Sequence, residues 1–317
     1  MDPKENLLRA IHYDDPAWVP HAGEDFRVTV QFDGNFCRKD WTDGWGVGWR
    51  VTLAEFVPFP KVNPLPSLDR LADYRPPNPG DLTVGEEMRA VLERPDRERL
   101  FITGQLTYLL FERAWALMGM DACLMAFHTH PQEMHALLGA IADYNVAVFE
   151  RYLELGVDAI GFSEDLGTQR ALMMSPKTFR EFLLPQYERC FAPVLAAGVA
   201  VNFHSCGCVQ DIVADLAGIG VTVLNPVQAR ANDLARVKRD AAAGGMALQG
   251  GVDSHLLVVG TPEEVRRETL RVLRTLGPGG GYILGPDQGM LWPQENYGAM
   301  LEVAEEHGRY PLDLPEE

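Results

Sequence analysis

The sequence predicts an α/β fold, most specifically a (β/α)8 TIM barrel, on three observations. From residue 100 onwards, short apolar runs alternate with amphipathic helical segments over short connections. The apolar runs are continuous rather than alternating, which is typical of parallel strands buried on both faces. The length of 317 residues suits one barrel. A doubly wound open sheet is the alternative, but no glycine-rich phosphate-binding turn follows any of the strands.

The part of the chain before residue 100 is the least regular. Residues 4–11 are typical of a short helix, and a first strand is expected near residues 21–23. Residues 24 to about 95 are irregular, with many prolines and with tryptophans at 41, 45 and 49. Aromatic residues at this density pack as a cavity wall more often than they form a linker. We therefore expect one TIM-barrel domain over residues 1–317, with residues 24–95 as a lid-like insertion near the barrel mouth.

The later strands and helices carry clear boundary signals. Strands are predicted over residues 100–104, 159–163, 199–204, 222–225, 247–251 and 282–285. Between them, residues 134–153 keep the helical period of 3.6. Ser175 is placed as the N-cap of a further helix. Thr261 and Glu264 form a capping box, and Gly277 ends the helix that this box opens.

Composition and charge exclude several classes of partner. The formal net charge of −17 disfavours binding to phosphate backbones or anionic lipid, which normally requires a basic face. Five cysteines form no evenly spaced disulfide framework, which favours a reducing compartment. The N-terminus lacks a signal-peptide pattern, and no apolar run approaches the ~18 residues of a membrane span. We expect a cytoplasmic protein whose partners are small molecules or proteins, with no nucleic acid and no membrane.

Metal-ligand residues follow the strand predicted over residues 199–204, in the run His204-Ser205-Cys206-Gly207-Cys208. The imidazole of His204 and the thiolate of Cys206 are two residues apart, so in extended backbone both face one side. Both are ligand types of zinc, whose tetrahedral sites need at least one more protein ligand here. The candidates are Glu164, Asp165, Cys208 and Asp287. We favour Glu164, and we expect the thiol of Cys208 to point into the packing of the next helix.

Polar residues end most of the predicted strands. Each has an ordinary structural explanation, such as a helix cap for Asp253 or a turn for Asp287. As a set at the carboxyl ends of successive parallel strands, they would converge on one cavity. The set consists of Gln105, Glu164, Asp165, His204, Cys206, Asn225, Gln228, Asp253 and Asp287. The sequence therefore predicts a site at the mouth of the barrel.

Seven longer motifs are spread over most of the chain. They read Asp15-Pro16-Ala17-Trp18-Val19-Pro20, Phe111-Glu112-Arg113-Ala114-Trp115, Glu164-Asp165-Leu166-Gly167-Thr168-Gln169 with Ser175-Pro176, His204-Ser205-Cys206-Gly207, Leu224-Asn225-Pro226-Val227-Gln228, Gly250-Gly251-Val252-Asp253 and Gly279-Gly280-Gly281-Tyr282-Ile283-Leu284. Together they resemble the uroporphyrinogen decarboxylase-like superfamily. The resemblance implies a TIM barrel, in agreement with the pattern of strands and helices.

Two activities of this superfamily compete. Its decarboxylases bind a carboxylate-rich substrate and carry an arginine-containing segment near the first strand, whereas residues 21–27 here read His-Ala-Gly-Glu-Asp-Phe-Arg. An acidic segment would repel such a substrate, which disfavours uroporphyrinogen decarboxylation. Its cobalamin-dependent methyltransferases resemble this chain in the His-x-Cys zinc motif. They move methyl groups between a corrinoid protein and a thiol, or from methyl ethers to the corrinoid.

The residues after the last strand favour the ether reaction. Methyltransferases that act on a thiol typically have a further cysteine there, whereas this chain has Pro286-Asp287-Gln288-Gly289. A carboxylate or amide in place of a thiolate makes the metal harder and better suited to an oxygen ligand. The resemblance thus implies methyl transfer from an O-methyl donor, specifically a methoxylated aromatic, to the cobalt of a separate corrinoid protein.

This expected reaction assigns a role to each candidate residue. Zinc held by Glu164, His204 and Cys206 polarises the leaving oxygen, and Asp165 or Asp287 supplies its proton. The substrate-binding candidates are Trp45, Trp49, Phe56, Gln105, Asn225, Gln228 and Asp253. The corrinoid (cobalamin) is expected on a partner protein, and a homodimer is compatible with the sequence. The alternatives are a zinc-dependent methylcobamide:thiol methyltransferase and a uroporphyrinogen decarboxylase-like protein that acts as a decarboxylase or as a non-catalytic binding protein.

Overall fold

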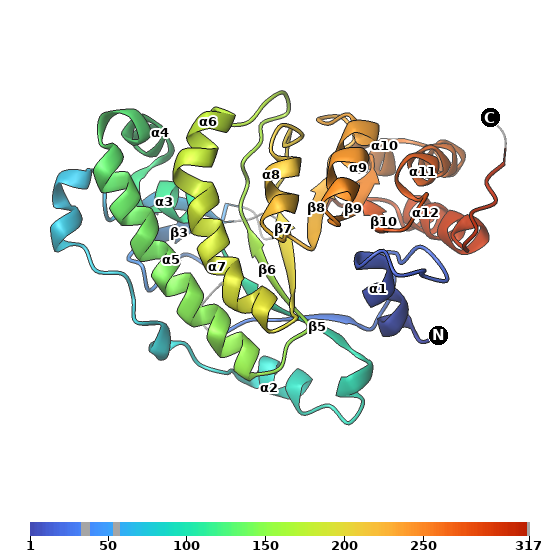
Figure 1. The fold of residues 1–317 in the computed structure, drawn as a ribbon, viewed down its shortest axis with the longest axis horizontal. Helices are drawn as coiled ribbons and strands as arrows, with labels where there is room; N and C mark the ends of the chain where they lie inside the picture. Colours follow the sequence, from blue (N-terminus) through green and yellow to red (C-terminus); the bar gives the residue numbers. More distant parts are fainter. Residues whose placement is uncertain (33–38, 53–57, 316–317) are drawn as a thin grey trace.

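The computed structural model describes residues 1–32, 39–52 and 58–315. Its main sheet is curled and parallel, with the strand order β1-β5-β6-β7-β8-β9-β10 (Figure 1). The strands are β1 (Arg27–Val30), β5 (Phe101–Leu106), β6 (Ala159–Ser163), β7 (Ala200–His204), β8 (Val223–Val227), β9 (Ala247–Val252) and β10 (Tyr282–Pro286). The predicted α/β fold is confirmed. Within the described residues, however, the main sheet has seven strands rather than the eight of a complete (β/α)8 barrel.

The first strand lies later in the chain than predicted. Residues near 21–23 form only an isolated parallel bridge, between His21 and Leu284 of β10. The carboxylate of Glu24 then accepts hydrogen bonds from the backbone N–H of His21 and from the indole N–H of Trp18, both at 3.3 Å, which turns the chain before β1 begins. Residues 21–30 therefore pair with two strands. His21 pairs with β10, and β1 pairs with β5.

Helices connect the strands in the order that the sequence predicts. In Figure 1 the helices α5, α7, α8 and α9 follow one another along the sheet. The helices are α1 (Pro3–Ile11), α2 (Glu86–Leu92), α3 (Phe111–Met118), α4 (Met120–Thr129), α5 (Pro131–Glu154), α6 (Pro176–Thr178), α7 (Leu184–Ala196), α8 (Val213–Gly218), α9 (Leu234–Ala243), α10 (Ser254–Val259), α11 (Pro262–Leu276) and α12 (Gln294–His307). The predicted N-cap Ser175 and the capping box of Thr261 and Glu264 are both present. Among the described residues, no helix has the length and apolar character that crossing a membrane requires.

A small apolar cluster closes the amino end of the sheet. Leu7 and Ile11 of α1 pack against one residue from the beginning of each strand from β5 to β10. These strand residues are Phe101, Ala159, Ala200, Val223, Ala247 and Ile283. Because α1 fills this end, the carboxyl ends of the strands remain for a functional site, as is usual for parallel barrels.

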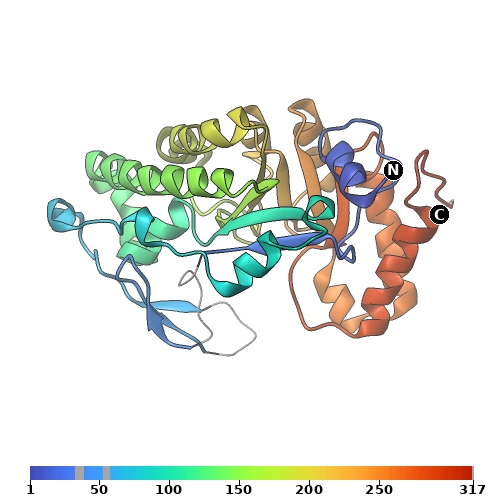
Figure 2. The same cartoon turned by 90° about the horizontal axis from the view of Figure 1, so that it is seen from below.

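The segment predicted to be irregular contains regular structure. Besides β1, it forms an antiparallel sheet of β2 (Trp41–Thr42), β3 (Gly48–Arg50) and β4 (Phe59–Val62). In Figure 2 this small sheet, drawn in blue, lies away from the layer of green and yellow helices. Trp49 stacks on Tyr108, just beyond β5, with ring centroids 5.0 Å apart and planes at 1°. The insertion thus packs beside the carboxyl end of β5, and its role as a lid stays a prediction.

Candidate metal centre and mouth cleft

Three metal-ligand side chains meet at the carboxyl ends of β6 and β7. The ligand atoms of Asp165, His204 and Cys206 all lie within 4.8 Å of one another. His204 Nε2 is 3.5 Å from Cys206 Sγ and 3.6 Å from Asp165 Oδ1. His204 ends β7, and Asp165 comes two residues after the end of β6, so neighbouring parallel strands bring them together.

The residues present fit a zinc ion. A tetrahedral zinc with bonds of about 2.0–2.3 Å holds neighbouring ligand atoms about 3.4–3.6 Å apart. The separations of 3.5 Å and 3.6 Å match that spacing. His204 Nδ1 lies 3.1 Å from Asn225 Oδ1, and the Asn225 amide donates in turn to Asn202 Oδ1. In the tautomer that donates from Nδ1, Nε2 keeps its lone pair for a metal.

The thiol of Cys206 is in an environment that disfavours its anion. Burial, followed by the nearby carboxylate of Asp165, raises the pKa of the Cys206 thiol to about 12. A thiolate, the form that ligates metals, is therefore unfavourable here without a compensating cation. A divalent cation bound between Asp165, His204 and Cys206 would supply that compensation.

The loops after β6 and β7 are fastened to each other by backbone contacts. The backbone N–H of Cys206 donates to Asp165 Oδ1 at 2.8 Å, and that of Cys208 donates to the carbonyl of Thr168 at 2.7 Å. Gly207 has a φ of +84°, and a Cβ built there would lie 2.3 Å from the carbonyl oxygen of Gly167. The close approach that places Asp165 beside Cys206 therefore depends on glycine at position 207.

Gln228, predicted to bind substrate, holds the Cys206 loop instead. Its side chain is buried, and Oε1 accepts hydrogen bonds from the backbone N–H of Gly207 at 2.9 Å and from the Gln169 amide at 3.2 Å. Asn232 lies in the same segment after β8 as Gln228, and its Nδ2 donates a hydrogen bond to the carbonyl of Gly207 at 2.9 Å. The segment after β8 thus stabilises the backbone that presents Cys206.

Glu164, the favoured third metal ligand, faces away from this group. It is fully buried, and its two oxygens accept hydrogen bonds from the backbone N–H groups of Leu110, Phe111 and Glu112, at 3.1, 2.6 and 3.2 Å. The hydroxyl of Tyr187 also donates to it, at 2.5 Å. Glu164 therefore satisfies the first N–H groups of α3. Asp165 occupies the place in the ligand group that we predicted for Glu164.

The two late aspartates also serve the backbone. Asp287 is buried, and its oxygens accept hydrogen bonds from the N–H groups of Ser254 at 2.9 Å and Ala229 at 3.1 Å. Burial raises the pKa of its carboxyl. Asp253 is the N-cap of α10 and pairs with Arg230 at 2.5 Å. Neither aspartate belongs to the ligand group or lines the cleft described next, so the predicted roles in proton donation and substrate binding are not supported.

A cleft of about 330 Å³ opens beside His204, and we refer to it as the mouth cleft. Two predicted substrate-binding residues, Gln105 and Asn225, line it. Its remaining lining residues are Thr107, Tyr108, Gly161, Phe162, Ser163 and Asn202. This volume is in the range of small-molecule sites. A metal held by Asp165, His204 and Cys206 would therefore have room for a substrate at its side.

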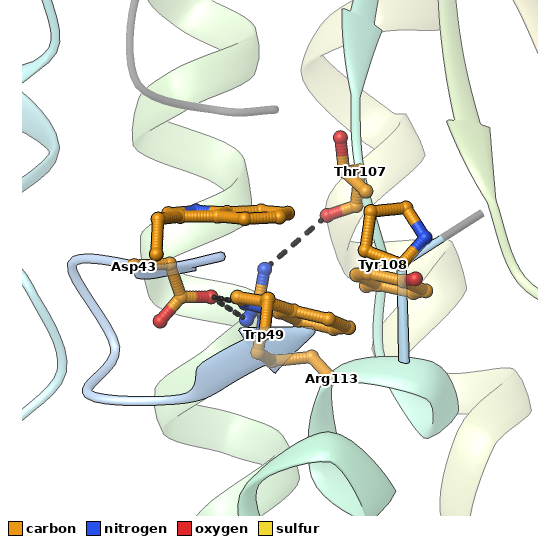
Figure 3. A pocket seen from close by; sticks show the side chains of 7 residues that line it. Asp43, Trp49, Thr107, Tyr108 and Arg113 are labelled. Carbon is orange, nitrogen blue, oxygen red and sulfur yellow. Dashed lines mark hydrogen bonds and ion pairs between the residues drawn. The ribbon is translucent and has the colours of Figure 1, made fainter. Parts of the chain in front are cut away.

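The predicted aromatic residues lie outside the mouth cleft. Trp49 is buried between Trp41 and Tyr108, with its indole N–H donating to Asp43 Oδ2 at 3.0 Å (Figure 3). Trp45 lines a second cavity, next to Arg113. Phe56 lies outside the residues that the structure describes.

One residue of the site, Glu112, was not among the predicted site residues. It is buried, and its carboxyl accepts a hydrogen bond from Ser163, which lines the mouth cleft, at 2.5 Å. Burial and the neighbouring carboxylates of Asp165 and Glu164 raise the pKa of Glu112 well above its usual range. The motif Phe111-Glu112-Arg113 contained the signal, but helix position alone did not indicate which of its side chains faces the strand ends.

Comparisons with known proteins agree with this architecture. The uroporphyrinogen decarboxylase (URO-D) family model matches residues 45–307. A uroporphyrinogen decarboxylase of Rhodococcus erythropolis is 35% identical over 155 residues, which cover 46% of this chain and 38% of that protein. One of Rhodococcus opacus is 33% identical over 188 residues, 56% of this chain and 49% of that protein. The matched part thus spans less than half the length of these two curated relatives.

Solved structures add information on the fold. A methyltransferase from Methanosarcina mazei superposes with a TM-score of 0.71 over 96% of this chain and 99% of that chain. The two sequences are 16% identical, so the likeness concerns the fold. The family match, in contrast, includes β5 to β10 and all three residues of the ligand group. This chain therefore belongs to the uroporphyrinogen decarboxylase (URO-D) family.

Proposed function

We propose that this chain is a zinc-assisted methyltransferase that takes a methyl group from an O-methyl donor, specifically a methoxylated aromatic. The observation that carries the proposal is the group of Asp165, His204 and Cys206 beside the mouth cleft. Two of the separations between its ligand atoms, 3.5 Å and 3.6 Å, match those of a tetrahedral zinc site, which would leave a fourth position for substrate. The ligand set differs from our expectation only in its carboxylate, which is Asp165 instead of Glu164.

The chemistry of the ligand set supports an oxygen-bearing substrate. Zinc held by one carboxylate, one imidazole and one thiolate would act as a Lewis acid toward an ether oxygen, whose departure as an aryloxide is otherwise slow. His204 is oriented for this purpose by Asn225, and the backbone N–H of Cys206 fixes the carboxylate of Asp165. The amide and hydroxyl groups of Gln105, Thr107 and Ser163 line the space where the substrate would bind.

The proposed reaction requires a methyl acceptor. In the overall exchange the carbon–oxygen bond of the ether breaks, the methyl group passes to the reduced cobalt of a corrinoid, and the aryloxide takes a proton. We propose that the corrinoid is carried by a partner protein, which would dock over the carboxyl ends of the strands. Transfer to or from a thiol is the variant that the carboxylate ligand makes less favourable.

Decarboxylation is a second candidate, because the curated relatives carry that name. A carboxylate-rich substrate needs cationic side chains, and among the described residues no lysine or arginine lines the mouth cleft. Arg27 of β1 donates to Gln249 Oε1 at 2.7 Å and lines a space of about 10 Å³ near α1 instead. The charge distribution therefore favours an uncharged substrate.

Two measurements test the proposal. Metal analysis of the purified protein should find one zinc per chain, reduced in His204→Ala and Cys206→Ser and retained in His255→Ala, whose histidine lies outside the ligand group. Incubation with a methoxyarene and a reduced corrinoid protein should then yield the phenol, and chromatography measures the amount of phenol formed. Native protein without metal would refute the zinc site. Release of carbon dioxide from uroporphyrinogen, with no phenol from any methoxyarene, would favour the second candidate.

A further inference from the structure

A second cavity lies next to the mouth cleft, and we call it the aromatic chamber. Its volume is about 340 Å³, close to that of the mouth cleft. The chamber is bounded by the insertion, the loop after β5 and helix α5. The lining residues that matter for the argument are Trp45, Asn78, Asp81, Tyr108, Tyr144 and Asn145. Each of the two cavities is large enough for one substituted ring.

The chamber and the mouth cleft share one wall. Thr107 and Tyr108 line both spaces. Tyr108 has a φ of +61°, a conformation that is uncommon for a bulky residue, and its ring is held against Trp49 (Figure 3). Such local strain concentrates at functional sites, where the surrounding structure maintains it. The two cavities are therefore adjacent at Thr107 and Tyr108.

The charged residues that line the chamber are one buried ion pair and one further carboxylate. Arg113 is buried and pairs with Asp43, with Nη1 and Oδ2 2.7 Å apart (Figure 3). Its guanidinium also lies over the ring of Trp45, at 5.0 Å, and faces Tyr108 at 5.6 Å. The remaining charge among the lining residues is the carboxylate of Asp81. An anionic group would thus meet no unpaired cation among the lining residues, which disfavours carboxylated and phosphorylated ligands.

The chamber offers hydrogen bonds as well as aromatic surface. Trp45 and Tyr144 meet edge to face, with ring centroids 4.7 Å apart. Neither the Tyr108 nor the Tyr144 hydroxyl makes a hydrogen bond to another described residue, and neither oxygen is sealed from solvent. Two hydroxyl groups on aromatic walls suit a ring that carries a hydroxyl of its own.

We propose that the aromatic chamber binds the distal ring of the methyl donor, so that the donor is an uncharged aryl methyl ether with two rings. This inference rests on the proposed function, because the methoxy group of the first ring is assigned to the mouth cleft. Thr107 and Tyr108 contact the bond between the rings, and the Tyr144 hydroxyl meets the polar substituent of the distal ring.

Calorimetric binding with three probes tests the chamber without relying on catalysis. The probes are 4-methoxyphenol, 4′-methoxybiphenyl-4-ol and 4′-methoxybiphenyl-4-carboxylate. The neutral two-ring probe should bind at least about 10-fold tighter than the one-ring probe, since burying a second ring contributes more than a tenfold change in Kd requires. The carboxylate should lose most of this gain. Equal affinities for the three probes would overturn the proposal.

A variant that fills the chamber tests whether the second ring of the probe binds there. Gly44 lines the chamber but not the mouth cleft, and a Cβ built there meets Pro77 Cβ at 3.4 Å, an ordinary contact. Gly44→Leu should reduce binding of the two-ring probe at least about 10-fold and leave the one-ring probe unchanged. Gly139→Leu, on an open face of α5, is the matched control. A parallel loss for both probes, or no loss for either, would place the second ring elsewhere.

The chamber and the proposed function can fail separately. Tight binding of the two-ring probe without phenol formation in the corrinoid assay would retain the chamber and reject the reaction. Phenol formation from the one-ring ether, with no preference for two rings, would retain the reaction and reject the chamber. Should Gly44→Leu not fold, Tyr144→Phe provides the same test by removing one hydroxyl, with Tyr297→Phe as its control.

Discussion

The carboxylate of Asp165 accepts a hydrogen bond from the backbone N–H of Cys206, at 2.8 Å, and the same oxygen lies 3.6 Å from His204 Nε2. One side chain thus anchors the loop after β7 and contributes to the ligand group. This double role distinguishes Asp165 from its neighbour Glu164, whose oxygens are occupied by α3. The carboxylate that is free to meet a cation is the one at the strand ends.

Replacing Asp165 should separate these two roles. Asp165→Asn keeps an oxygen that can accept the Cys206 N–H but removes the anionic ligand, so we expect a folded protein with weakened zinc binding. Asp165→Ala should lose zinc and also loosen the Cys206 loop, which lowers the melting temperature. Zinc content and thermal unfolding, measured together, check both expectations. Full zinc occupancy in Asp165→Ala would show that this carboxylate is no ligand.

Asn225 should act on the metal without touching it. Its Oδ1 lies 3.1 Å from His204 Nδ1, and loss of such a partner typically reduces metal affinity about 10- to 100-fold. We therefore expect Asn225→Ala to bind zinc more weakly in a competition titration with a chromogenic chelator. Asn63→Ala, in the insertion, removes a side-chain hydrogen bond far along the chain from β7 and is the control. An unchanged zinc affinity in Asn225→Ala would contradict the orienting role.

The strands could be predicted where burial is complete. Residues 159–163 coincide with β6, and the predicted strand over 282–285 differs from β10 by one residue, because continuous apolar runs are typical of strands covered on both faces. β1 was missed because Arg27–Val30 is short and places charged and polar residues among its apolar ones. Its position is fixed by pairing with β5, which is a tertiary contact that local sequence does not express.

The sequence predicted two members of the ligand group, His204 and Cys206, but it did not decide whether Glu164 or Asp165 is the third. His204 and Cys206 are two residues apart and on one side, as the period of extended backbone requires. Glu164 and Asp165 are adjacent, so they face different directions, and the sequence does not state which one faces the mouth. That choice is made by the N-terminus of α3, whose N–H groups bind Glu164, and this helix begins more than 50 residues earlier in the chain.

Gly207 should be intolerant of a side chain. Its φ of +84° and the distance of 2.3 Å between a built Cβ and the Gly167 carbonyl oxygen leave no room for alanine. We expect Gly207→Ala to destabilise the protein by more than about 1 kcal/mol and to lower zinc binding, because the Cys206 loop must move. Gly139→Ala, in the middle of α5 with open space around it, should instead stabilise by about 0.5–1 kcal/mol. Urea unfolding of both variants provides the comparison, and equal stabilities would contradict the close approach.

Glu164 should make stability depend on pH. Burial raises the pKa of its carboxyl from 4.5 to about 7, although Tyr187 and the N–H groups of α3 oppose that shift. The folded chain therefore holds this proton more tightly than the unfolded chain. Its contribution to stability is fully present below the unfolded pKa of 4.5 and is lost as the pH rises toward about 7. The loss is on the order of 3 kcal/mol, because each pKa unit corresponds to about 1.4 kcal/mol.

Glu164→Gln isolates this effect. The amide does not titrate, so the free energy of unfolding of the wild type minus that of the variant should fall as the pH rises from 4.5 to about 7, and then level off. The variant should also be less stable at low pH. Its NH₂ group would face backbone N–H groups that now donate hydrogen bonds to the carboxyl oxygens, and two donors cannot pair. Urea unfolding of both proteins across this pH range measures the difference. A difference that does not change with pH would contradict the raised pKa.

Arg113 and Asp43 should be energetically coupled. The pair is buried, with side-chain exposures of 6% and 9%, and it lies between the insertion and α3. Arg113→Met should destabilise the protein by about 3–5 kcal/mol, because it leaves the Asp43 carboxylate buried without its partner. The double variant Arg113→Met with Asp43→Asn should be more stable than Arg113→Met alone, since no uncompensated charge remains. Urea unfolding of the two single variants and the double variant gives the coupling energy, and simple additivity of the two single effects would show that the pair contributes no interaction of its own.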